Sequence, residues 1–79
     1  MKLGNYEFEI EDMIEQESEN AKHFTLEVDG KTVVEIYDGV DADEDGLCSD
    51  IWVRVDGERY NWSWQFIIDF RKEVEYLYY

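Results

Sequence analysis

The stretch HFTLEVDGKTVVEIYD, residues 23–38, decides the fold of this chain. Phe24, Leu26 and Val28 alternate with other residues, a pattern that predicts a strand with one apolar face. A DG dipeptide at positions 29–30 separates this strand from a second one. Such a dipeptide is typical of a type I′ turn, because both central residues of that turn have positive φ. The stretch therefore predicts an antiparallel β-hairpin.

The same pattern recurs at residues 49–64, where SDIWVRV and ERYNWSW flank a second DG dipeptide. Apolar residues at alternate positions face one side of the first of these strands, while Trp52 and Arg54 face the other. The sequence therefore predicts two hairpins, which an acidic loop at residues 38–50 joins.

The period of the apolar residues changes after the second hairpin. Helical spacing predicts a C-terminal amphipathic helix with Asn61 or Ser63 as its N-cap. Its apolar stripe is expected to consist of Trp64, Ile67, Ile68, Val74 and Leu77, widened by Phe70 and Tyr78.

The N-terminal segment is ambiguous. YEFEI alternates like a strand, but the good helix formers that follow favour a helix somewhere within residues 6–19. The expected fold is a single α+β domain over residues 1–79. It consists of a four-stranded antiparallel sheet of two hairpins, a C-terminal amphipathic helix and a short N-terminal element.

Charge is the strongest functional signal. The chain has 21 acidic and 7 basic residues, a net charge of −14. The excess lies in two runs without Lys or Arg, residues 7–19 and 35–50. Such a surface repels nucleic acid and anionic membranes, so it indicates either a high-salt environment or a basic partner. With no apolar run of membrane-spanning length and no signal peptide, we expect a cytoplasmic protein.

The segment DADEDGLCSDIW, residues 41–52, resembles half of an EF-hand loop. Asp41, Asp43, Asp45 and a following glycine fit the first positions of such a loop, but Trp52 stands where a bidentate Glu is required. Weak Ca²⁺ binding by these three aspartates is an alternative to a solvated acidic turn. No other metal or cofactor is expected.

An enzyme is not expected. His23 and Cys48 are the only residues of their kinds, so a zinc cluster is unavailable. The acidic neighbours of Cys48 disfavour its thiolate, and no shielded carboxyl with the raised pKa of a general acid is indicated.

Acidic residues gathered on a folded face would approach the charge density of a phosphate row and would bind a basic nucleic-acid cleft. The interpretation that follows is a protein that contacts a basic nucleic-acid-binding protein, and not nucleic acid itself. The expected contact residues are Glu7, Glu9, Glu11, Asp12, Glu15, Asp38, Asp41, Asp43, Glu44, Asp45, Asp50 and Trp52.

In size, composition and layout of its acidic runs, the chain resembles the small acidic anti-CRISPR and anti-restriction inhibitors that phages encode, many of which mimic DNA. No diagnostic motif carries this resemblance. It implies that the partner is a nuclease effector such as a CRISPR-Cas subunit, in the cytoplasm of the host cell. Alternatives are an immunity protein against a basic nuclease toxin and the weak Ca²⁺ module. The sequence leaves both a monomer and a homodimer open.

Overall fold

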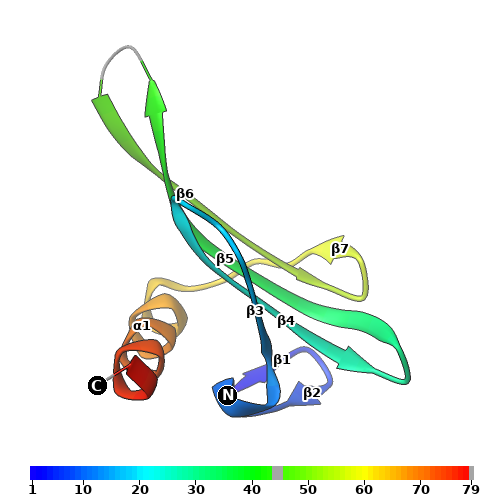
Figure 1. The fold of residues 1–79 in the computed structure, drawn as a ribbon. Helices are drawn as coiled ribbons and strands as arrows, with labels where there is room; N and C mark the ends of the chain where they lie inside the picture. Colours follow the sequence, from blue (N-terminus) through cyan, green and yellow to red (C-terminus); the bar gives the residue numbers. More distant parts are fainter. Residues whose placement is uncertain (44–45, 79) are drawn as a thin grey trace.

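The computed structural model describes residues 1–43 and 46–78, and for residues 41–43, 47 and 76–78 it describes the backbone alone. Over these residues no helix combines the length and the apolar character that crossing a membrane requires. Figure 1 shows the elements, which in chain order are β1 (Lys2–Leu3), β2 (Tyr6–Glu7), the 3-10 turn η1 (Ile10–Asp12), β3 (Ile14–Gln16), β4 (Ala21–Val28), β5 (Lys31–Asp43), β6 (Gly46–Val55), β7 (Glu58–Arg59) and α1 (Trp64–Tyr78).

The main sheet is antiparallel, and each of its strands pairs with the next one along the chain, in the order β3-β4-β5-β6-β7. A separate two-stranded sheet consists of β1 and β2. The α+β class and the C-terminal helix are confirmed. The predicted four-stranded sheet of two hairpins is wrong, because the described chain adds a fifth strand, β3, and a second small sheet.

The expected N-terminal helix is replaced by β2, η1 and β3. Ile14 pairs with Thr25, and Gln16 pairs with His23. The Nε2 of Gln16 also donates to Oγ1 of Thr25 at 3.0 Å. Helix propensity contributes only a few tenths of a kcal/mol per residue, and short helices are marginal in water. Pairing with β4 satisfies backbone groups that an uncovered edge would leave open, so tertiary context prevails.

The acidic segment at residues 38–50 is not a loop between two separate hairpins. β5 pairs with β6 from Val34↔Val55 through to Asp43↔Gly46. The second predicted hairpin therefore shares a long ladder with the first. Its last strand is short, because only Glu58–Arg59 pair with β6. The loop was predicted because this segment is acidic. A two-stranded ribbon with water on both sides also tolerates acidic side chains, so acidic composition does not distinguish the two.

Both DG turns are confirmed. Asp29 and Gly30 have φ of 52° and 79°, and Asp56 and Gly57 have φ of 54° and 82°. Positive φ at both central residues is the mark of the type I′ turn, whose twist matches that of the flanking strands.

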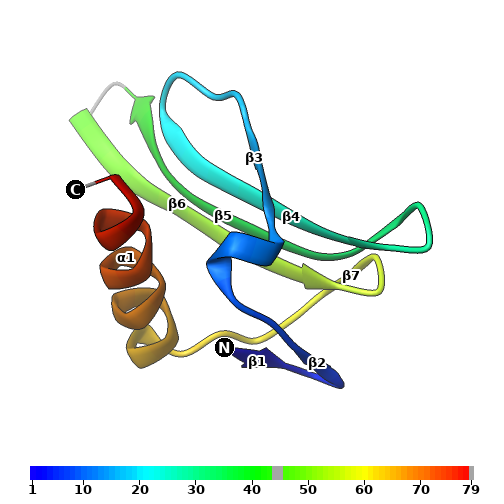
Figure 2. The same cartoon turned by 60° about the horizontal axis from the view of Figure 1, so that its bottom comes forward.

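The hydrophobic core lies on one side of the main sheet, where α1 and the N-terminal segment both cover it (Figure 2). Alternation along the strands sends every second residue to this side. The sheet contributes Phe24, Leu26, Val34, Ile36 and Val53, the N-terminal segment Leu3, Phe8, Ile10 and Met13, and the helix Phe70 and Val74. The rings of Phe24 and Phe70 meet edge to face at 5.6 Å.

The N-cap of α1 is Ser63, one of the two predicted candidates. Its Oγ accepts from the backbone N–H of Phe66 at 3.2 Å, and its carbonyl accepts from the N–H of Ile67. The predicted apolar stripe is only partly right. Ile67, Phe70 and Val74 are buried, whereas Trp64 is 57% exposed and Ile68 is 41% exposed. The side chains of Leu77 and Tyr78 lie outside the described part of the chain.

A glycine marks the point where the sheet narrows from three central strands to two. β4 begins at Ala21, opposite Gly39, and past this pair β5 and β6 continue alone. We call this two-stranded extension, residues 40–43 and 46–49, the arm. A Cβ on Gly39 would lie 2.7 Å from Cε1 of Tyr37 and 2.9 Å from Cβ of Ala21. The Tyr37 ring therefore lies over Gly39, and only glycine leaves room for it.

Replacing Ser63 with Ala should lower the free energy of unfolding by about 1 kcal/mol, because the N–H of Phe66 loses its acceptor. Urea denaturation measures this change. Asn61→Ala is the matched control and should change stability by less than half as much. Equal losses in the two variants would remove Ser63 from its role as N-cap.

Replacing Gly39 with Ala should destabilise the protein by about 1–3 kcal/mol, the usual cost of overpacking. It should also alter the near-UV circular dichroism, because the Tyr37 ring must move. The double variant Ala21→Gly/Gly39→Ala removes one of the two clashes and should recover part of the loss. A fully stable Gly39→Ala variant with an unchanged spectrum would contradict the close packing of Tyr37 on Gly39.

Candidate interaction surfaces

The arm carries the densest part of the second acidic run. Figure 1 shows β5 and β6 extending well past the rest of the sheet. In the backbone register Asp41 pairs with Cys48 and Asp43 with Gly46. The side chains of Asp41 and Asp43 lie outside the described part of the chain, as do Glu44 and Asp45 entirely. Asp50, at the base of the arm opposite Gly39, is exposed.

Asp38 faces the interior of the protein and binds the helix. Its carboxylate accepts from Nε of Arg71 at 2.7 Å and from Nη2 at 2.9 Å, a bidentate pair. The Asp38 side chain is only 11% exposed. The hydrogen bonds to this carboxylate raise the pKa of Arg71. The charge of Asp38 is therefore compensated within the protein.

The N-terminal acidic residues follow the segment that covers the core. Glu7 lies on β2, Glu9, Glu11 and Asp12 lie at η1, and Glu15 lies on β3. All five are exposed. Some have local partners, since Oδ2 of Asp12 accepts from the N–H of Glu9, and Glu15 lies 3.8 Å from Nζ of Lys22.

The β1–β2 hairpin that precedes these acids is tied to the second DG turn. The Tyr6 hydroxyl donates to Oδ1 of Asp56 at 2.6 Å. This hydrogen bond to a carboxylate raises the pKa of Tyr6, because it stabilises the protonated phenol.

The first acidic run does not lie as one block. Its last acid, Glu19, lines the same hollow as Val40 and Ser49 of the arm, and the N–H of Val40 donates to the carbonyl of Asn20. The β1–β2 hairpin, in contrast, lies at the end of the molecule away from the arm (Figure 1). The structure therefore separates β2 from the arm and brings the end of the first acidic run to the base of the arm.

The side of the main sheet opposite the core carries a connected group of aromatic and polar side chains, which we call the open face. Cross-strand neighbours place Gln16, His23, Tyr37 and Trp52 in one row. The Tyr37 and Trp52 rings are stacked, with centroids 5.0 Å apart and an interplanar angle of 4°. His23 meets both rings edge to face, at 5.3 and 5.7 Å.

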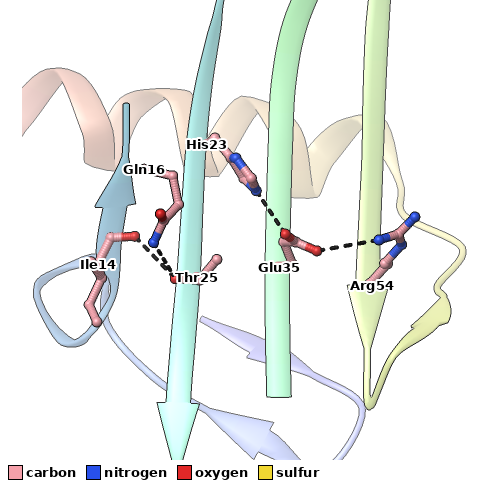
Figure 3. Close-up of polar contacts among 6 residues, drawn as sticks. All are labelled: Ile14, Gln16, His23, Thr25, Glu35 and Arg54. Atoms are coloured by element: carbon pink, nitrogen blue, oxygen red, sulfur yellow. Dashed lines mark hydrogen bonds and ion pairs between the residues drawn. The ribbon is translucent and has the colours of Figure 1, made fainter. Parts of the chain in front are cut away.

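A second row of cross-strand neighbours is polar except for Ile14 at its end. It runs through Ile14, Thr25, Glu35, Arg54 and Arg59. Figure 3 shows Glu35 between two partners, with Nε2 of His23 at 2.9 Å and Nη1 of Arg54 at 3.7 Å. The side chains of His23 and Glu35 are each 20% exposed. This charged group is therefore half-buried and held in place by its neighbours.

Both arginines of this row lie over the Trp52 ring. The guanidinium carbon of Arg54 is 4.7 Å from the ring centroid, and that of Arg59 is 5.5 Å away. Cations in this position are attracted by the negative face of an indole. Trp52 was predicted as a contact residue beside the acids, but it lies at the centre of an aromatic and cationic group.

Sequence analysis missed His23, Glu35, Tyr37 and Arg59 as a group. The available signal was the alternation itself. Residues 23, 25, 35, 37, 52 and 54 all occupy strand positions that alternate with core residues, so they share the other face once the register is known. The register depends on the two DG turns, which the sequence did reveal.

The described residues hold no group of three or more His, Cys, Asp and Glu side chains placed to bind a metal ion. The Ca²⁺ alternative concerns Asp41, Asp43 and Asp45, whose side chains are outside the described part. The backbone on both sides of that segment forms strands, not the helices of an EF-hand.

Comparison with protein-family models, with curated proteins and with solved structures finds no match to this chain.

Proposed function

We propose that this protein is a non-enzymatic inhibitor that binds the basic nucleic-acid-binding surface of a nuclease effector, in the manner of anti-CRISPR DNA mimics. The observation that carries the proposal is the arm. It is a narrow ribbon that extends beyond the sheet, and its sequence is rich in acids.

The charge of the arm has no compensation from its own strands. Between Lys31 and Arg54 the chain holds seven acids and neither Lys nor Arg. Asp38 is paired with Arg71, and Glu35 is paired with Arg54. The acids that remain in this stretch are Asp41, Asp43, Glu44, Asp45 and Asp50, all on or beside the arm. The acids that remain in this stretch are thus concentrated in the sequence of the arm and at its base.

The dimensions of the arm suit a channel built for nucleic acid. Alternate residues on a strand are about 6.6 Å apart, and paired strands lie about 4.8 Å apart. A single DNA strand carries one phosphate per about 3.4 Å of helix axis. Five carboxylates within ten residues therefore approach the linear charge density of such a strand. A basic channel that binds phosphates would attract them over a distance set by the ionic strength.

The N-terminal acids act in a different way in this proposal. The acids at β2 lie far from the arm, so a channel that holds the arm does not contact them directly. They add to the net charge of −14, which steers the protein toward a basic surface before contact. The arm makes the contact, and the remaining acids raise the association rate.

Charge reversal tests the arm. The variant Asp41→Lys/Asp43→Lys/Asp45→Lys should lose competition with target duplex for a purified CRISPR effector complex, measured by band shift. We expect at least a hundredfold rise in the concentration that gives half inhibition, because three attractive contacts become repulsive. The matched control is Glu27→Lys/Glu73→Lys/Glu75→Lys, which changes the net charge equally at exposed positions outside the arm.

The control should shift inhibition by less than tenfold, through weaker steering alone. If both triple variants lose inhibition equally, net charge is responsible and not the arm. If the wild-type protein in excess leaves duplex binding unchanged across a panel of effectors with basic channels, the proposal of DNA mimicry is wrong.

Salt should weaken the complex steeply. Raising NaCl from 50 to 200 mM should lower the affinity of the wild-type protein for its effector by at least tenfold, because ion-pair formation is screened. Isothermal titration calorimetry at several salt concentrations measures the slope. The arm triple variant should show a shallower slope, and an affinity independent of salt would rule out an electrostatic contact.

A further inference from the structure

The open face has charges of opposite sign at its two ends. Along β6, Asp50, Trp52 and Arg54 occupy alternate positions and so point to this same side. Arg59 of β7 lies directly beside Arg54. The face therefore runs from an acid at the base of the arm, through the aromatic row, to two arginines near the second DG turn.

The charges at both ends have capacity for further contacts. Among the described side chains, neither Asp50 nor Arg59 makes a hydrogen bond or ion pair. Arg54 and Arg59 are cross-strand partners, and like charges in such positions are unfavourable unless an anion offsets them. Glu35 reaches Arg54 at 3.7 Å, and the Arg54 side chain is still 46% exposed.

We infer that two copies of this chain associate through their open faces, with a two-fold axis that runs across the strands along the row of His23, Tyr37 and Trp52. Rotation about this axis reverses the strand direction of the second copy. Asp50, two residues before Trp52 in one copy, then faces Arg54, two residues after Trp52 in the other copy. Arg54 of each copy meets Asp50 of the other, so one surface supplies both halves of two equivalent ion pairs.

The shape of the face fits this arrangement. Facing sheets pack about 10 Å apart, which leaves room for one layer of side chains from each. Glu35 of one copy lies opposite the Tyr37 ring that covers Gly39 in the other. The half-buried Trp52 and Tyr37 rings lie at the axis, and they are of the residue types that dominate interface energetics.

Pairing of the two copies along the edge of β6 does not produce these contacts. The edge of β6 at Arg54 and Val55 is already occupied by β7. Association through the open face also points the two arms in opposite directions, which limits repulsion between them. It leaves both arms free, so it is compatible with the binding of a basic partner and does not require it.

Sedimentation equilibrium over a range of protein concentrations at 150 mM NaCl tests this inference. The wild-type protein should reach twice the 9.5 kDa of one chain. Asp50→Lys and Arg54→Glu should each raise the dimer dissociation constant at least tenfold, because every reversal creates two contacts between like charges. The double variant Asp50→Lys/Arg54→Glu restores the opposite signs and should return to within about threefold of wild type.

Mixing the two single-reversal variants gives the most specific test of the proposed contacts. Equimolar Asp50→Lys and Arg54→Glu proteins, each monomeric alone, should form a heterodimer, since Lys at 50 faces Glu at 54 and Asp at 50 faces Arg at 54. Glu73→Lys and Lys72→Glu on the exposed side of α1 are the charge-matched controls, and both should dimerise like wild type. Circular dichroism and thermal melting of each variant identify any loss of fold.

A wild-type protein that remains monomeric at all concentrations overturns the inference. So does a dimer that both single reversals leave intact, or a mixture of the two variants that stays monomeric. Trp52→Ala, which leaves the charges in place, should also weaken the dimer at least tenfold. A folded Trp52→Ala variant with wild-type dimerisation would place the interface elsewhere.

Discussion

The backbone ladder between β5 and β6 is the constraint on which the rest of the structure depends. It begins in the middle of the main sheet, where Val34 pairs with Val55, and continues without interruption to Asp43 and Gly46. Its inner half holds the most deeply buried strand residues, among them Val34, Ile36 and Val53. Its outer half has no third strand and forms the arm. The register of this ladder thus determines both which residues of β5 and β6 face the core and where the arm leaves the sheet.

Because this register is fixed, each strand divides its residues between two environments. The side that α1 covers is apolar, and its stability comes from burial. The other side combines a stacked pair of rings, a His–Glu contact and two guanidinium groups over an indole. Glu35 and Arg54 on this side are paired with each other. A slip of one residue would exchange the two faces, so the DG turns that set the register also determine the composition of the outer surface.

The sequence was sufficient for some of these features. The DG dipeptides predicted both turns, and the sequence narrowed the N-cap of the helix to Asn61 or Ser63, because in each case a local chemical requirement dominates. The extent of β5 and β6 was not predictable from composition, since acids in a ribbon exposed on both sides look like loop residues. The third strand, at Ile14–Gln16, depends on a neighbour distant in sequence. For the same reason Asp38 was predicted to be a surface acid, because its partner Arg71 lies 33 residues away in the sequence.

The contact between Asp38 and Arg71 has a mechanical consequence. Asp38 immediately precedes Gly39, the residue at which β5 leaves the support of β4, and Arg71 lies near the middle of α1. The planar guanidinium donates two hydrogen bonds to the carboxylate. This bidentate geometry restricts the rotation of the two groups as well as their separation. The base of the arm is therefore held against α1 by this ion pair. A force on the arm is therefore transmitted to the core through the Asp38–Arg71 ion pair as well as through β5 and β6.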